Sequence, residues 1–138
     1  MTHLVDTSVW VDYIQGRGSE AVDCLHGLLE MPIAVGLNHQ IYLEILQGAR
    51  STDAFARLQR YLSTQRFYGF VDDLAGYEAA ANLYFQCRQR GITVRSSIDC
   101  LIAQCAIEND LILLHQDRDF IYMQDAVPAL NQIHFLGG

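Results

Sequence analysis

The sequence contains no lysine, and all nine of its basic residues are arginines. This absence excludes several chemistries together. A P-loop uses a lysine to reach the phosphates of its nucleotide, and a Schiff-base enzyme needs a lysine amine. Receiver domains and haloacid-dehalogenase phosphatases carry acidic residues at their strand ends, but they also depend on a lysine. An enzymatic function of this chain must therefore rest on other side chains.

The sequence also lacks long apolar runs. The longest clean ones, such as the run LILL at 111–114, are far shorter than the ~20 residues that span a bilayer. The N-terminus shows no basic region that leads into an apolar one, so no signal peptide is visible. A length of 138 residues is typical of one compact domain. We therefore expect a single cytoplasmic domain over residues 1–138 with no membrane segment.

Cysteine is sparse, and the four cysteines form no C-x-x-C pair. In a reducing compartment, such cysteines are expected to be small apolar core residues, because a zinc site or a disulfide framework needs regular spacing or an oxidising environment. The residues concerned are Cys24, Cys87, Cys100 and Cys105.

Positive charge is also in short supply, since the formal net charge is −7. This charge argues against a broad basic surface that binds nucleic acid passively. An enzyme that acts on nucleic acid remains possible, because carboxylates that hold divalent ions present a positive site once the ions are bound.

Short apolar runs alternate with longer amphipathic runs along the chain. Strands are expected at His3–Val5, Ile33–Val35, Phe67–Phe70, Leu111–Leu114 and Ile133–Leu136. Helices are expected at Ser8–Gln15, Glu20–Glu30, His39–Ala49, Asp53–Ser63, Leu74–Arg90, Ile98–Asn109 and Asp119–Met123. This alternation is typical of an α/β protein whose mostly parallel sheet of about five strands is covered on both faces. Ligands of such sheets gather at the carboxyl ends of the strands.

Two acidic residues are expected at that edge. Asp6 directly follows the first strand, and Asp117 follows the strand at 111–114 after two residues. A buried carboxylate without a cationic partner is costly, so these acids indicate a divalent metal site. Asp6 can instead cap the next helix, although Thr7 is an equally good cap. Asp119 is the reserve for Asp117, and the loop that carries both can also be a solvated turn with a helix cap at Asp119.

Two further acids fall on the inward side of expected helices. Glu44 lies on the same side of its helix as Ile41 and Gly48, and the glycine leaves room beside it. Asp99 points toward the apolar side of its helix, but Ser96-x-x-Asp99 also fits a capping box. We therefore predict that both acids join the metal site, with a cap as the alternative for Asp99.

Four segments, in this order, resemble the PIN-domain ribonucleases, and specifically the VapC toxins of bacterial toxin–antitoxin pairs. The segments are Leu4–Trp10, Glu44–Gly48, Asp99–Ala103 and Asp117–Phe120. The resemblance implies a three-layer α/β/α sandwich, one or two Mg²⁺ or Mn²⁺ ions, an RNA substrate, a small antitoxin partner and a homodimer. It implies that Ser8 supports the site and that the ions are bound by an acidic quartet, namely Asp6, Glu44, Asp99 and Asp117.

The resemblance leaves three nearby residues to be interpreted. Many relatives carry Thr, Ser or Asn near the position of His115, and a lone histidine is more often structural than catalytic. Arg95 and Arg118 are the arginines nearest to the acids in sequence, and each can contact a substrate phosphate or remain a plain surface charge.

A metal-dependent endoribonuclease toxin is the resulting hypothesis. Bound ions would activate a water and stabilise charge on the phosphate, so the products should carry 5′-phosphate and 3′-hydroxyl ends. Two alternatives have the same fold. One is a catalytically silent interaction module, and the other is a housekeeping nuclease that processes RNA without an antitoxin.

Overall fold

The protein is described by a computed structural model that covers residues 1–137. Five strands form one sheet in the order β3-β2-β1-β4-β5, and every neighbouring pair is parallel. The prediction of an α/β protein with a mostly parallel sheet of about five strands is therefore confirmed. The strands are β1 (His3–Val5), β2 (Val35–Leu37), β3 (Arg66–Phe67), β4 (Ile112–Leu114) and β5 (Gln132–Ile133).

Helices connect the strands. Each expected helix is present, and its ends lie within two residues of those expected from the sequence. The α-helices are α1 (Thr7–Ile14), α2 (Glu20–Leu29), α3 (His39–Gln47), α4 (Thr52–Leu62), α5 (Asp73–Gln89), α6 (Ser97–Glu108) and α7 (Arg118–Tyr122). A short 3₁₀ helix, η1 (Met123–Asp125), continues α7.

The helices begin where the sequence offers a side-chain cap. Every α-helix starts after an Asp, Asn or Ser whose side chain accepts a hydrogen bond from a backbone N–H of the first turn. Such caps satisfy N–H groups that the helix itself leaves without a partner. They explain why the helix starts were the easiest boundaries to locate from the sequence.

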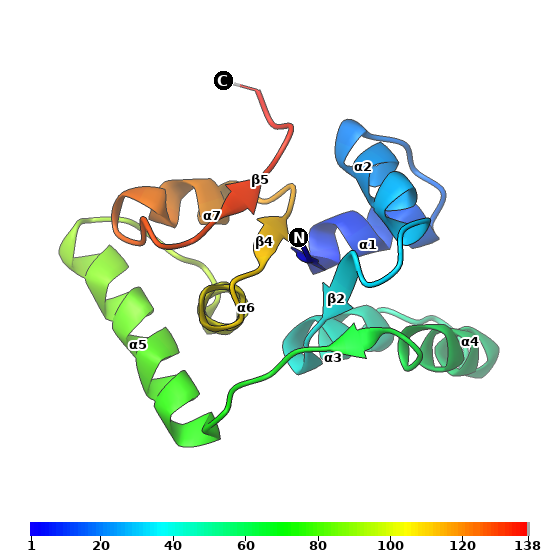
Figure 1. Ribbon diagram of the computed structural model, residues 1–138, viewed down its shortest axis with the longest axis horizontal. Coiled ribbons are helices and arrows are strands. Elements are labelled where there is room, and N and C mark those ends of the chain that lie inside the picture. The colour runs from blue at the N-terminus through cyan, green and yellow to red at the C-terminus, as the bar shows by residue number, and fades with distance from the viewer. Residues whose placement is uncertain (138) are drawn as a thin grey trace.

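The connections place helices on both faces of the sheet. From β1 the chain runs outward to β2 and β3, and it then returns to place β4 on the other side of β1. Because crossovers between parallel strands are right-handed, the two directions put their helices on opposite faces. Figure 1 shows α1 and α2 on one side of the sheet and α6 with α7 on the other. The result is the three-layer arrangement that the resemblance implied.

Both faces of the central strands are buried. Leu4 and Val5 of β1 and Leu113 and Leu114 of β4 are fully inaccessible to solvent. Three of the four cysteines are buried as well, and all four are free thiols, as expected for apolar core residues. The central strands therefore read as continuous apolar runs, which is typical of a parallel sheet covered by helices.

Strand boundaries differ more from the expectation. The second strand begins at Val35 and extends to Leu37, because Ile33 adopts a left-handed φ of 55° that ends the preceding turn. Gly36 of this strand lies against the ring of Tyr68, and a Cβ at this glycine would approach the ring to 2.6 Å. β3 and β5 are two residues each, so the expected runs at 67–70 and 133–136 are mostly irregular.

Candidate active site and metal centre

The candidate site lies where the strand order reverses, between β1 and β4. These strands pair in register, with Val5 opposite Leu114. The Asp6 N–H extends the ladder by donating to the Leu114 carbonyl at 2.9 Å. The chain leaves β1 toward one face of the sheet and β4 toward the other, so a crevice opens at the carboxyl ends of these two strands.

Asp6 is the N-cap of α1 and is almost completely buried. One carboxylate oxygen, Oδ2, accepts from the Ser8 N–H at 3.0 Å and from the Ser8 hydroxyl at 2.6 Å. Of the two caps that the sequence offered for this helix, Asp6 is therefore the one that forms, because Thr7 is already the first helical residue. Asp6 caps with a single oxygen, so the other remains available to the site.

Ser8 connects Asp6 to the loop that carries Asp117. Its hydroxyl donates to Asp6 and accepts from the Gln116 N–H at 3.1 Å. The Gln116 amide then donates to the Ser8 carbonyl at 2.9 Å and to the Asp12 carboxylate at 2.8 Å. The loop after β4 is thereby fastened to α1, which supports the expected role of Ser8.

Glu44 is half-buried on α3 and is held by α1. Its Oε1 accepts from the Thr7 hydroxyl at 2.7 Å. The fully buried positions of α3 are Ile41 and Ile45. Gly48 is the exposed C-cap of the helix, and the idea that it leaves room beside Glu44 stays a prediction.

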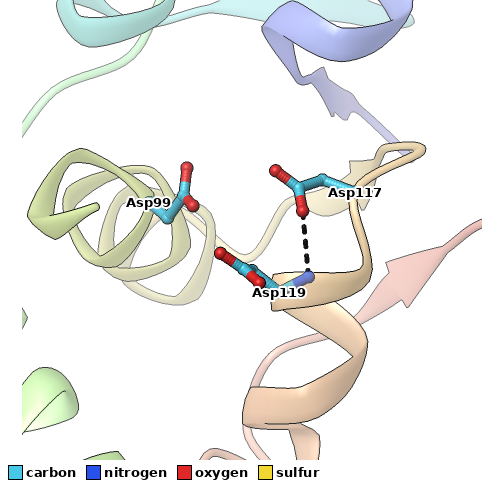
Figure 2. A group of neighbouring side chains, drawn as sticks. All are labelled: Asp99, Asp117 and Asp119. Carbon is cyan, nitrogen blue, oxygen red and sulfur yellow. Dashed lines mark hydrogen bonds between the residues drawn. The ribbon is translucent and has the colours of Figure 1, made fainter. Parts of the chain in front are cut away.

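Three carboxylates converge in front of the sheet edge. One oxygen each from Asp99, Asp117 and Asp119 lies within 4.8 Å of the others. Figure 2 shows the three side chains pointing toward a common space from α6, from the loop after β4 and from the start of α7. The reserve residue Asp119 therefore joins the cluster together with Asp117. Asp6 and Glu44 lie outside this tightest group.

The caps around this cluster differ from the expectation. Ser96 caps α6 by accepting from the Ile98 N–H at 3.2 Å. Within residues 1–137, Asp99 accepts no hydrogen bond from the Ser96 backbone, so the proposed capping box does not form. Asp117, rather than Asp119, caps α7 by accepting from the Asp119 N–H at 2.9 Å.

Arg95 binds the two acids of α7. Its Nε and its backbone N–H donate to Oδ2 of Asp119 at 3.0 and 3.3 Å. One of its terminal nitrogens lies 3.3 Å from Oδ1 of Asp117. This guanidinium therefore brings a positive charge to the cluster. Arg118 points elsewhere, since it donates to the Gly137 carbonyl at 3.0 Å.

The carboxylates disfavour one another's ionisation. Burial raises the pKa of Asp6 to about 6, and the Glu44 and Asp117 charges add to this effect against the Ser8 hydrogen bonds that oppose it. Burial also raises the pKa of Asp99 to about 7. Four neighbouring carboxylates raise it further, in the order Asp6, Asp117, Glu44 and Asp119. All five acids therefore share one electrostatic environment.

His115 is a structural residue. It is fully buried, and burial lowers its pKa to about 4, so the ring is neutral at pH 7. Nδ1 accepts from the Asp117 N–H at 3.2 Å, which leaves Nε2 to donate to the Gln132 side chain at 2.7 Å. The ring packs on Phe120 with centroids 5.0 Å apart. It holds the Asp117 loop against β5.

The sequence interpretation missed three residues that position the site. Thr7 was treated only as a cap, Gln116 carried no recognisable signal, and Arg95 was assigned to substrate but not to the acids. Each acts through a partner far away in sequence, so neither spacing nor periodicity could identify it.

Comparison with known proteins agrees with this geometry. A family model described as PIN domain matches residues 3–125. The chain belongs to the PIN-domain family. VapC ribonuclease Mb1587 of Mycobacterium bovis and ribonuclease VapC11 of Mycobacterium tuberculosis are each 38% identical to it over 118 residues. These matches cover 85% of this chain and 87% of each relative. The resemblance drawn from the four motif segments is confirmed.

Solved structures show the same fold. VapBC2 from Rickettsia felis, bound to a DNA fragment from its promoter, matches with a TM-score of 0.75 at 18% identity, over 98% of this chain and 99% of that chain. FitAcB from Neisseria gonorrhoeae matches with a TM-score of 0.68 at 16% identity, over 96% of both chains. The PIN-like sandwich is therefore confirmed.

Within residues 1–137, no helix is both long and apolar enough to span a bilayer.

Proposed function

We propose that this protein is a metal-dependent endoribonuclease that acts as the toxin of a toxin–antitoxin system. The supporting observation is the convergence of Asp99, Asp117 and Asp119 within 4.8 Å, beside Asp6 and Glu44, in a chain of the PIN-domain family. Relatives that are 38% identical carry the name VapC ribonuclease. An acidic set at this edge of the sheet is the feature that the activity requires.

The residues fit a hard divalent cation such as Mg²⁺ or Mn²⁺. The donors are carboxylate oxygens, which these ions prefer. Burial and the neighbouring carboxylates raise the pKa of Asp6 and of Asp99, although Arg95 pairs with Asp117 and Asp119, so a divalent ion would favour the ionised forms of these two acids. We assign metal binding to Asp6, Glu44, Asp99 and Asp117, with Asp119 as the reserve. When bound, such ions would lower the pKa of a water molecule and neutralise negative charge on a phosphate.

The protein's own groups orient this set. Ser8 fixes one oxygen of Asp6, and Thr7 fixes one oxygen of Glu44. Arg95 remains largely exposed although it is anchored on Asp119. Its free N–H groups can therefore donate to a substrate phosphate beside the carboxylates. Because water attacks in place of the ribose 2′-hydroxyl, the products carry 5′-phosphate and 3′-hydroxyl ends.

The test is cleavage of total RNA by the purified full-length chain. Cleavage is expected with Mg²⁺ or Mn²⁺ and is expected to stop in excess chelator. Asp6→Asn should reduce the rate by at least 100-fold, on the order of a lost ligand or orienting group, whereas Glu78→Gln, an exposed acid on α5, should cleave as wild type. Cleavage that survives chelation, or products that end in a 2′,3′-cyclic phosphate, would contradict the proposal.

A second experiment tests the toxin role separately. Expression of the wild-type chain in bacterial cells should arrest growth, and expression of Asp99→Asn should not. Co-expression of a small antitoxin encoded beside the gene should restore growth. Metal-dependent cleavage in vitro without growth arrest would favour a housekeeping nuclease of the same fold.

The partners follow from the same proposal. We infer a cytoplasmic protein that forms a homodimer and is neutralised by a small antitoxin. A solved toxin–antitoxin complex from Klebsiella pneumoniae shares this fold, which supports an antitoxin partner. Among the aromatic and aliphatic residues of the first half, Trp10 is fully buried and belongs to the core. Ile14 and Phe55 are exposed, so they are available to a partner.

A further inference from the structure

A groove of about 800 Å³ opens beside the carboxylate cluster. Its walls are the connection between α5 and α6 on one side and α7 with η1 on the other. Asp119 belongs both to this groove and to the carboxylate cluster, so the two are continuous. The volume lies within the roughly 300–1,000 Å³ that is usual for sites of small organic ligands.

The groove contains two cationic side chains, although two acids, Asp119 and Asp125, line it as well. Arg95 and Arg118 both line it, in a chain with a formal net charge of −7. Arg118 is exposed and, within residues 1–137, forms no ion pair with a carboxylate. One of its terminal nitrogens donates to the Gly137 carbonyl, and the other terminal nitrogen is available to an anion. A phosphate that bridges two nucleotides is an anion of suitable size for this position.

The same groove carries an aromatic surface. Tyr122, at the end of α7, lines the groove and is 52% exposed although it is a large apolar ring. Ile92 and Ile121 extend the apolar wall around it. A nucleobase that stacks on such a ring gains about 1–3 kcal/mol, irrespective of its identity. The faces of a base inside a duplex are covered by the neighbouring base pairs, so only an unpaired base can stack on this ring.

We propose that this groove binds one unpaired nucleotide next to the phosphate that is cleaved, with the base on Tyr122 and a backbone phosphate on Arg118. This inference rests on the proposed ribonuclease function, and it assigns Tyr122 and Arg118 to the nucleotide beside the scissile phosphate. The metal centre then receives the neighbouring phosphodiester because Asp119 joins the two sites.

Binding is measured with Asp99→Asn as the background, so that the RNA is not cut. The probe is a short fluorescent single-stranded RNA of mixed sequence, followed by anisotropy with Mg²⁺ present. Tyr122→Ala should weaken binding by about 5- to 150-fold, which corresponds to the stacking energy. Tyr122→Phe should retain the affinity. Tyr77→Ala is the matched control, because that tyrosine is 50% exposed on α5 and lies outside the groove.

The arginine has its own readout. Arg118→Gln should weaken RNA binding. The slope of log affinity against log salt concentration should also fall in magnitude by about one, as expected for the loss of one phosphate contact. Neither substitution should alter the affinity for the same oligonucleotide annealed to its complement. In the otherwise wild-type chain, Tyr122→Ala should raise KM more than it lowers kcat. Thermal melting of each variant separates misfolding from lost contact, and Tyr122→Phe shows whether the ring itself is needed.

The outcomes distinguish this inference from the proposed function. If cleavage depends on metal but Tyr122→Ala and Arg118→Gln bind and cleave as wild type, the groove assignment is wrong and the ribonuclease stands. If Tyr122→Ala weakens RNA binding although the wild-type chain cleaves no RNA, the groove stands and the ribonuclease does not. An equal effect of Tyr122→Ala on duplex and single-stranded RNA also overturns the proposal.

Discussion

Removal of the Asp99 charge should stabilise the metal-free protein. The pKa of this carboxyl rises from 3.8 to about 7 on folding. Since one pKa unit corresponds to about 1.36 kcal/mol, ionised Asp99 disfavours the native state by about 4 kcal/mol. Between these two pKa values the native state keeps a proton that the unfolded state has released, so stability falls as pH rises through this window. Asp99→Asn keeps the shape and removes this effect.

The assay is urea unfolding in excess chelator. At about pH 8, the free energy of unfolding of Asp99→Asn should exceed that of wild type by up to about 4 kcal/mol, and near pH 4 the difference should fall below about 1 kcal/mol. Glu78→Gln should show no such pH-dependent gain. Mg²⁺ or Mn²⁺ at 100 times its Kd should return about 2.7 kcal/mol to the wild type and less to the variant. If Asp99→Asn is no more stable than wild type at pH 8 in chelator, the reasoning that burial and the neighbouring carboxylates disfavour the ionised form of Asp99 is refuted.

Other substitutions test the scaffold of the site. Gly76→Ala should lower the free energy of unfolding in urea by about 1–3 kcal/mol, because its Cβ would approach the Phe70 ring to 2.2 Å. The control is Gly27→Ala, whose Cβ meets nothing within 4 Å and which should not destabilise the protein. The difference in free energy of unfolding between wild type and His115→Gln should shrink by about 2 kcal/mol between pH 7 and pH 5. The pKa of His115 is lowered in the native state, so only the wild type loses stability as its unfolded state takes up a proton. An unchanged difference would mean that the ring is not buried in its neutral form. Thr7→Val should lower kcat/KM about tenfold by freeing the acid on α3, and Thr7→Ser should restore it; a rate unchanged in Thr7→Val would remove this residue from the site.

The sequence was informative wherever a local signal and the global fold agreed. β1 was located to the residue because a buried run ends at an acid that caps the next helix. Asp99 and Asp117 were identified because carboxylates are unusual on an inward helical face and just after a buried strand. These inferences needed only periodicity and the rule that parallel strands present their carboxyl ends to one edge.

The sequence was uninformative where a contact joins distant segments. The left-handed φ of Ile33 cannot be foreseen for a β-branched residue, and it displaced the expected second strand by two residues. The bond between Thr7 and Glu44 spans 37 positions, and the bond between Gln116 and Ser8 spans 108. Such pairings exist only once the sheet order is known, so they could not be derived from residue spacing.

The choice between aspartate and glutamate at the site follows from what each acid must do for the fold. Asp6 and Asp117 follow strands and cap helices, and a cap needs the short side chain that reaches its own backbone two residues later. Each caps with one oxygen and leaves the other to the cluster. Glu44 lies in the middle of a helix, caps nothing and needs a longer side chain to reach the same space. Asparagine would preserve either cap and remove the charge, whereas glutamate would preserve the charge and lose the cap. Aspartate at the strand ends therefore meets the needs of the fold and of the proposed metal site together.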